Sequence, residues 1–283
     1  MILYQYVSAN VGMTILESNR VGFRKQQDFN DPLEGTLAPV QPGMNAELIL
    51  QQIMEHSDEE DLHKDVEYAV RMSQPTMSAV SLGMNCVVLC LTKKPTNPLM
   101  WAHYSGLDGM VIGFDVDSEF FTGLNNICPI QFGDMIYSAE KPAPLVEAEN
   151  VPPADAWFRK AFEAPNLGRV QSAFLRKADR WGYEEEVRIV KRLNDESETG
   201  IRERTVCSAG RELFLYDLPD NSIVEVYRYF HPMRFHALRN SPGVGGGEEP
   251  KKFRDHIVET LGHKFFAVTH RLDSWEFDVH EDP

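Results

Sequence analysis

The sequence predicts an α+β fold in a single domain over residues 1–283, with a mixed, mainly antiparallel β core flanked by helices. Segments typical of strands outnumber segments typical of helices, and the two kinds do not alternate regularly. No internal repeat is visible. A chain of 283 residues with 42% hydrophobic and 25% charged residues can build a full hydrophobic core.

In the first half of the chain, hydrophobic patterning predicts strands separated by short helical or turn segments. A strand is expected over ILYQYV, then a short helix and a strand over GMTILESNRVGFR, with a break at Asn19 or Gly22. The segment DFNDPLEG has the composition of a turn. Residues 45–74 have the apolar spacing of two helices divided near Ser57. Buried strands are expected over CVVLCLT and GMVIGFDV, with a loop or short helical turn over PLMWAHYS between them.

The second half of the chain is predicted to be richer in strands. AFLRKADRW is interpreted as the end of a helix, with Arg176 and Lys177 near its C-terminal dipole. Strands are expected over YEEEVRIVKRL, RELFLYDLP, SIVEVYRYF and KFFAVTHRLDSWEFDV, and another within QFGDMIYS. PKKFRDHIVETLG predicts a helix closed by Gly262. A flexible loop is expected over about residues 241–250 because of its glycines.

The charge balance narrows the classes of partner. The chain has 43 acidic and 28 basic residues, for a net charge of −15, so non-specific binding to nucleic acid or to an anionic membrane is disfavoured. No apolar run is long enough for a membrane-spanning helix, and no signal peptide is expected, which favours a cytoplasmic protein. The four cysteines form no CxxC pair, so we expect reduced thiols and no metal site.

The most distinctive pattern is the predicted strand that carries Glu184, Glu186 and Arg188 on one side. One interpretation is a solvated face, where three charges need no partner. The other is a carboxylate pair in a cleft, because buried carboxylates need partners. In the cleft, one glutamate would bind a substrate hydroxyl or stabilise positive charge, and the other would orient or deprotonate a nucleophile. Arg188 would keep both ionised or bind a phosphate.

Two further segments are open to a structural or a functional interpretation. Trp101, His103 and Tyr104 either pack in the core or form a flat wall for a nicotinamide or purine ring. Asn30 and Asp31 either shape a turn or reach into a cleft from it, together with Glu34.

These motifs occur together in an order that resembles the prokaryotic family catalogued as domain of unknown function 2971. The order is a Tyr-rich first strand, Phe29 to Glu34, the strand end Cys90-Leu91-Thr92, Met100 to Tyr104, and Trp181-x-Tyr183-Glu184-x-Glu186-x-Arg188. The resemblance extends from the first strand to about Phe230.

The layout of this family is similar to that of ADP-ribosyltransferases, and the similarity implies a fold and roles for residues. Glu186 would be the catalytic glutamate that binds the nicotinamide ribose, and Glu184 would position the acceptor. Thr92 would supply the hydroxyl of the middle strand. The residues expected to line the NAD site are Tyr6, Asn30, Asp31, Thr92, Trp101, His103, Tyr104 and Arg188. NAD would be a substrate, and no metal is implied.

Three functions therefore remain open. The first is an NAD-consuming, ADP-ribosyltransferase-like enzyme, plausible as a toxin or anti-phage effector, with a protein or nucleic-acid acceptor and an antitoxin or defence-system partner. The second is a non-catalytic nucleotide-sensing or protein-binding module of the same fold. The third is a hydrolase of nucleotide or glycosidic bonds that uses Glu184 and Glu186.

Overall fold

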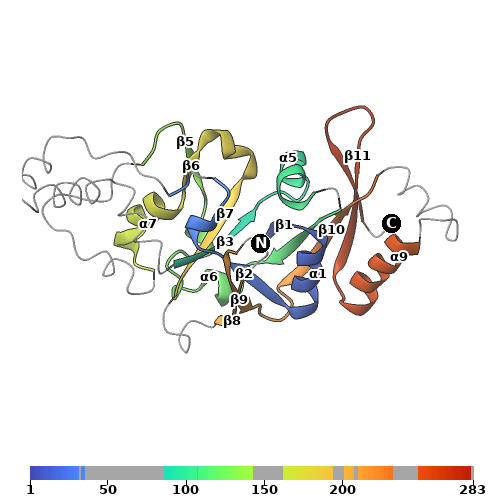
Figure 1. The fold of residues 1–283 in the computed structure, drawn as a ribbon, viewed down its shortest axis with the longest axis horizontal. Coiled ribbons are helices and arrows are strands. Elements are labelled where there is room, and N and C mark those ends of the chain that lie inside the picture. The colour runs from blue at the N-terminus through green and yellow to red at the C-terminus, as the bar shows by residue number, and fades with distance from the viewer. Residues whose placement is uncertain are drawn as a thin grey trace, which may run out of the picture.

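A seven-stranded mixed sheet forms the centre of the protein (Figure 1). The computed structural model describes residues 1–31, 33–35, 86–106, 108–142, 162–193, 201–206, 210–231 and 248–281. The strand order is β12-β11-β10-β4-β1-β3-β7. Only β10 and β11 are parallel neighbours within this sheet, and the other pairs are antiparallel. The strands are β1 (Ile2–Val7), β3 (Cys86–Thr92), β4 (Met110–Asp115), β7 (Glu186–Arg192), β10 (Ile223–Tyr229), β11 (Lys264–His270) and β12 (Phe277–Glu281).

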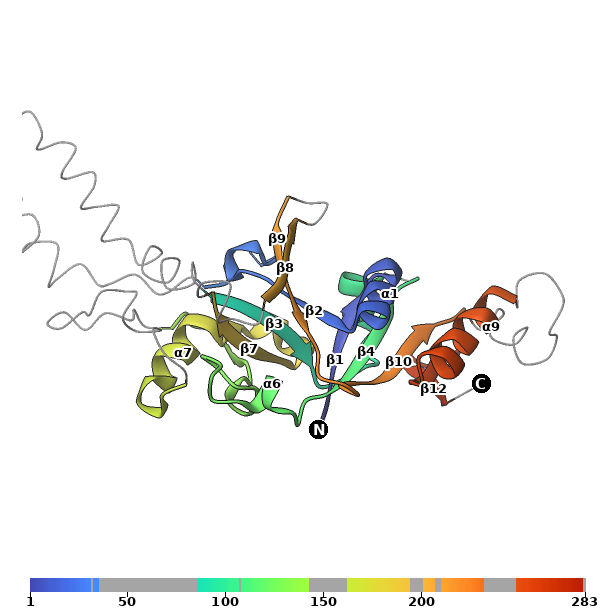
Figure 2. The same cartoon turned by 90° about the horizontal axis from the view of Figure 1, so that it is seen from below.

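Two smaller sheets accompany the main one. The first, in the order β2-β9-β8, contains β2 (Arg20–Phe23), β8 (Ile201–Val206) and β9 (Glu212–Asp217), and the second pairs β5 (Ile136–Ser138) with β6 (Arg176–Ala178). The β8–β9 hairpin projects away from the main sheet in Figure 2.

The helical segments of the described chain are short. The α-helices are α1 (Ala9–Ser18), α5 (Pro98–Met100), α6 (Glu119–Thr122), α7 (Leu167–Phe174) and α9 (Glu248–Asp255). The 3-10 turns are η1 (Gln26–Asp28), η3 (Ile130–Phe132), η5 (Ala164–Asn166) and η6 (Asp179–Glu184). Two π-helical turns, η2 (Trp101–Ser105) and η7 (His256–Thr260), directly follow α5 and α9.

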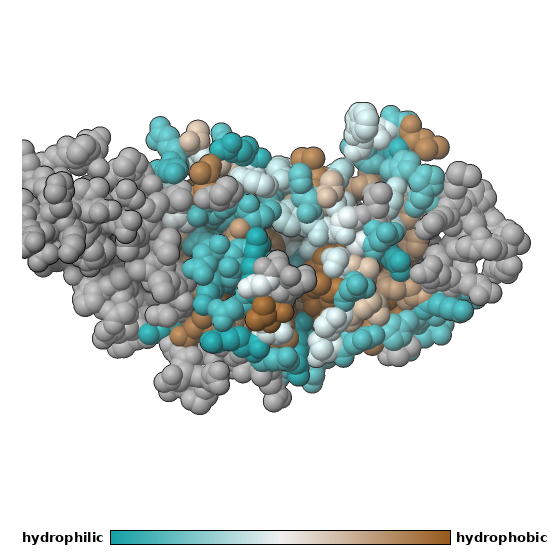
Figure 3. Space-filling view, viewed as in Figure 1, coloured by the Kyte–Doolittle hydropathy of each residue, from teal (hydrophilic) through white to brown (hydrophobic). Residues whose placement is uncertain are grey.

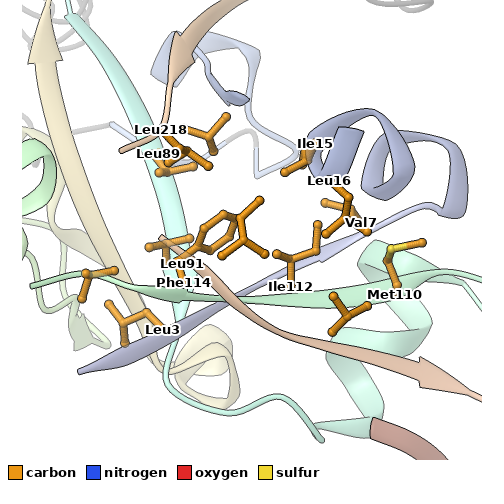
Figure 4. Packing of buried hydrophobic residues seen from close by; sticks show 14 of the residues in the cluster. Leu3, Val7, Ile15, Leu16, Leu89, Leu91, Met110, Ile112, Phe114 and Leu218 are labelled. Atoms are coloured by element: carbon orange, nitrogen blue, oxygen red, sulfur yellow. The ribbon is translucent and has the colours of Figure 1, made fainter. Parts of the chain in front are cut away.

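The main hydrophobic core covers one face of the large sheet. Figure 4 shows Leu91 of β3 beside Phe114 of β4 and Leu89 beside Leu218, with Ile112 on the side of α1. The alternation in β3 directs its odd-numbered apolar residues into this core. Cys86, Val88 and Cys90 point the other way, into a second core that includes Phe174 and Leu175.

The edge of the sheet at β7 is not left open. Segment 127–135 runs along it, with backbone hydrogen bonds from Arg188 N to Gly133 O (2.8 Å) and from Met135 N to Glu186 O (3.1 Å). The side chains of Glu186, Arg188 and Val190 share one face of β7, on the side of the second core. From Glu186 onward the alternation predicted for this strand is confirmed. The solvated-face interpretation is wrong, because Arg188 is 0% exposed.

Several elements differ from the sequence predictions. β7 begins at Glu186 and not at Tyr183, because Glu184 ends a 3-10 turn and Glu185 is left-handed (φ 43°, ψ 47°). Arg176 and Lys177 lie on β6 and not at a helix end, because α7 stops at Phe174. Strand β8 was not predicted from the sequence. The two helices expected over residues 45–74 and most of the predicted flexible loop lie outside the described residues.

The expected α+β class is confirmed: the chain forms a single α+β domain with a mixed, mostly antiparallel sheet and a few helices. The break predicted after the first helix is also confirmed, since Asn19 caps α1 in the left-handed conformation (φ 51°). Among the described helices, none has the length and apolar character needed to cross a membrane.

Candidate functional site

Glu184 and Glu186 are brought together by the tight change of direction between η6 and β7. Glu184 is the last residue of η6, and Glu186 is the first residue of β7. The left-handed conformation of Glu185 turns the chain between them. The backbone carbonyl of Glu184 accepts a 2.5 Å hydrogen bond from Thr92 Oγ1, which fixes this turn to the end of β3. Both carboxylates are buried, with Glu184 2% and Glu186 7% exposed.

Lys177 of β6 joins the two carboxylates. Its Nζ lies 2.6 Å from Glu184 Oε2 and 3.2 Å from Glu186 Oε2. The same Nζ is 4.9 Å from the centre of the Trp181 ring. A single buried ammonium therefore balances part of the charge of both glutamates.

Arg188 and Glu34 extend the cluster beneath Glu186. The Arg188 guanidinium contacts Glu186 through Nε (2.7 Å, to Oε1) and Nη2 (3.2 Å, to Oε2), and its Nη1 donates to the carbonyl oxygen of Phe174 (2.7 Å). Arg188 Nη2 also pairs with Glu34, whose side chain is buried. The Phe29 ring lies 5.1 Å from Arg188 Cζ. The turn from Phe29 to Gly35 is thereby attached to β7. We call Glu34, Lys177, Glu184, Glu186 and Arg188 the charge cluster.

The environment of the cluster separates the pKa values of its carboxyl groups. Burial alone would raise the pKa of Glu186, but the charges of Arg188 and Lys177 outweigh burial and lower it to about 2. Burial raises the pKa of Glu184 despite the opposing effects of Lys177 and Tyr104. Burial also raises the pKa of Glu34. Glu186 is thus a fixed anion, while Glu184 and Glu34 hold a proton more readily than an exposed glutamate.

Two tyrosines complete the hydrogen bonding around the carboxylates. The hydroxyl of Tyr104 donates to Glu184 Oε1 and accepts a 3.3 Å hydrogen bond from Asn30 Nδ2. The hydroxyl of Tyr137, on β5, accepts a 2.8 Å hydrogen bond from the backbone N–H of Glu186. Asn30 is exposed and Tyr104 is half-buried, so this path connects Glu184 to the surface.

Aromatic rings lie beside Glu184 on the same side as Tyr104. The Tyr183 ring is 6.0 Å from that of Trp181 and 6.3 Å from that of His103, and His103 is 6.5 Å from Tyr104. His103 is exposed, and the other three are half-buried. We call these four residues the aromatic wall. Partly open rings of this kind can stack on a planar group.

The other predicted site residues have contacts elsewhere. Trp101 is buried and packs edge-on against Tyr6 at 5.7 Å, in a core cluster behind the aromatic wall. The Tyr6 hydroxyl donates to Lys94 O and accepts from Asn97 N, both at 2.9 Å. Asp31 Oδ1 accepts from Leu33 N at 2.9 Å, as in an Asx turn, so the predicted turn is confirmed.

Sequence reasoning missed Lys177 and Tyr137 and considered Glu34 only as one possibility. Glu34 lies within the predicted turn segment, which was the available signal. The sequence around Lys177 does not indicate that it belongs to the site, because its partners lie on η6 and β7. The local pattern instead predicted a helix end. Within the described residues, no group of three or more His, Cys, Asp or Glu side chains is arranged to hold a metal ion.

Fold and site together define an α+β protein with a buried charge cluster bordered by aromatic rings. Residues 100–189 match the model of a family described as "Protein of unknown function (DUF2971)". The match confirms the resemblance inferred from the motifs over this part of the chain, which includes Tyr104, Lys177, Glu184, Glu186 and Arg188. No match was found among curated proteins or among solved structures.

Proposed function

We propose that the protein is an NAD-consuming enzyme with ADP-ribosyltransferase-like chemistry, and that Glu184 is its acid–base residue. The observation that carries the proposal is a pair of glutamates with opposite pKa shifts that share one lysine. When the pKa values of two neighbouring carboxyl groups differ in this way, one group can act as the proton acceptor and the other as a fixed anion.

The proposed reaction breaks the bond between C1′ of the ribose and the nicotinamide nitrogen. The bonding electron pair leaves with nicotinamide, which becomes neutral, and positive charge develops on the ribose. The fixed negative charge of Glu186, which lies near Glu184, would stabilise the positive charge that develops on the ribose. An acceptor O–H then attacks C1′, and its proton passes to the Glu184 carboxylate. With water as the acceptor the same steps amount to hydrolysis.

The surroundings of Glu184 support this division of roles. Tyr104 donates to one carboxylate oxygen and Lys177 to the other, so both hold the group in one orientation. The aromatic wall is suited to a planar leaving group such as nicotinamide. The role expected for Glu186 changes in this proposal: it acts as a charge and Glu184 exchanges the proton, since Glu186 is already bound by Arg188 and Lys177.

A second candidate is a nucleotide-binding module without turnover. The observation that favours it is that internal donors already occupy both oxygens of both carboxylates. Such a network can be rigid and preformed without taking part in a reaction. In this case NAD would raise the melting temperature and no product would form.

The test is incubation of the protein with NAD labelled in its adenine half, in a cell extract that supplies protein and nucleic-acid acceptors. Free nicotinamide and label on macromolecules are measured for the wild type and for Glu184→Gln. The matched control is Glu185→Gln, because Glu185 is the next residue but its carboxylate pairs with Lys94 at the surface. A toxin or anti-phage role would be examined only after an acceptor had been found.

We expect nicotinamide release by the wild type and by Glu185→Gln. In Glu184→Gln we expect the rate of release to fall at least about 100-fold. Label on macromolecules would support the transferase, and release without label would support the hydrolase. Absence of release together with stabilisation by NAD would support the binding module.

A further inference from the structure

The charge cluster has more buried carboxylates than buried cations. Glu34, Glu184 and Glu186 face Lys177 and Arg188, and the side chains of all five are at most 7% exposed. If every group were ionised, the cluster would carry one uncompensated negative charge. A buried charge without a partner is strongly destabilising, so a positive charge should be supplied to this cluster.

The lysines on the segment between β3 and α5 do not supply that charge. Lys93 pairs with Asp134 at 2.8 Å, and Lys94 pairs with Glu185. All four side chains are at least one-third exposed, so these are surface pairs that neutralise one another.

A proton can compensate the cluster in the free protein. Burial raises the pKa of both Glu34 and Glu184, which favours retention of one proton between them. A bound cation would compete with this proton, because either of them removes the surplus negative charge.

The aromatic wall gives such a cation a place next to Glu184. The faces of Trp181, Tyr183 and Tyr104 attract positive charge through their ring quadrupoles. The contact between Lys177 Nζ and the Trp181 ring, at 4.9 Å, is an interaction of this kind at the border between the wall and the cluster. Lys177 already occupies that border, so a flat cation would stack on the partly open rings of Tyr104 and Tyr183, beside the Glu184 carboxylate.

We propose that this site selects flat aromatic cations of the pyridinium type over neutral rings of the same shape, and that binding displaces a proton from the cluster. The inference rests on the proposed function and narrows its substrate class to nucleotides with a positively charged base, such as the oxidised form of NAD. The reduced form, whose nicotinamide ring is neutral, would be a poor ligand.

The experiment compares two small probes, N1-methylnicotinamide and nicotinamide, which have almost the same shape and differ in charge. Binding is measured by calorimetry in two buffers of different ionisation enthalpy, so that affinity and proton release are obtained together. We expect the cation to bind on the order of tenfold more tightly, with release of a proton, and the neutral ring to bind without proton release.

Glu34→Gln is the informative variant, because it removes the surplus charge and leaves two carboxylates facing two cations. We expect it to abolish the preference for the cation, whereas the control Glu185→Gln should retain it. If Glu34→Gln does not fold, the comparison of the two probes on the wild-type protein still decides the question.

Equal affinity for the two probes, binding of the cation without proton release, or no binding of either probe would overturn the inference. Neither probe contains a glycosidic bond, so these outcomes are separate from the test of NAD cleavage. Selection of the cation without nicotinamide release from NAD would support the inference and contradict the enzymatic function.

Discussion

At the scale of single residues, the site depends on how a few charged side chains are buried together. Strand alternation was enough to place Glu186 and Arg188 on one face, because side chains two residues apart in a strand point the same way. The burial of that face was not predictable, since it depends on how α7, β6 and segment 127–135 pack against β7, which no local pattern shows. For the same reason the role of Lys177 in the site was not predicted, because its neighbours in the sequence have the pattern of a helix end.

Lys177→Met tests the contribution of the shared cation. The change leaves Glu184 and Glu186 close together without the ammonium that lies between them. Removing one partner of a buried ion pair typically costs about 3–5 kcal/mol, and we expect a loss of that size in denaturant unfolding. The control is Lys93→Met, which breaks an exposed pair with Asp134 and should cost no more than about 1 kcal/mol. Similar losses in the two variants would show that the cluster does not have the energetic role assigned to it.

At the scale of elements, the existence of most strands of the main sheet was predictable from the sequence. The residues at which they begin and end were harder to predict. β3 and β4 have continuous apolar runs, and β1 alternates, so local composition determines them. The start of β7 was misplaced because Glu185 adopts a left-handed conformation that a glutamate seldom takes. That departure occurs between the two glutamates of the proposed site, where local rules are expected to fail.

The junction of segment 127–135 with β7 can be tested at Gly133. A Cβ at this position would lie 1.9 Å from the carbonyl oxygen of Arg188, which is backbone and cannot move aside. Gly133→Ala should therefore lower the free energy of unfolding by about 1–3 kcal/mol and displace Arg188.

Gly168→Ala is the matched control. An added Cβ at Gly168, within α7, would meet no atom within 4 Å, so we expect a gain of about 0.5–1 kcal/mol from helix propensity. Comparable melting temperatures for the two variants would contradict the close approach between segment 127–135 and β7.

At the scale of the whole molecule, the class of the fold followed from the proportion of strands and their irregular order, but the topology did not. The neighbours of β1 are β3 and β4, and β10 pairs with β4, which is far from it in sequence, so the order depends on long-range pairing. Figure 3 shows a face that is largely hydrophilic, with hydrophobic residues in small groups. The charge cluster is, in contrast, a separate and buried feature.

The dependence of global stability on pH should reveal this buried feature. The pKa of Glu186 is lowered to about 2 in the folded protein from 4.5, so Glu186 contributes stability above pH 4.5 and loses it as the pH falls toward 2. Glu34 and Glu184 act in the opposite sense, because their raised pKa values favour folding at lower pH.

We therefore expect a steep loss of stability below pH 4.5 in the wild type and a shallower one in Glu186→Gln, measured by unfolding at a series of pH values. Parallel curves for the two proteins would contradict the charge state assigned to Glu186.

The most direct test of the central claim is the time course of free nicotinamide from NAD, followed by chromatography for wild type, Glu184→Gln and Glu185→Gln at equal concentrations of folded protein. We expect steady release by the wild type and by Glu185→Gln, and at least about a 100-fold slower release by Glu184→Gln. Equal rates in all three proteins, or no release by any of them, would contradict the assignment of Glu184 as the acid–base residue of an NAD-consuming enzyme.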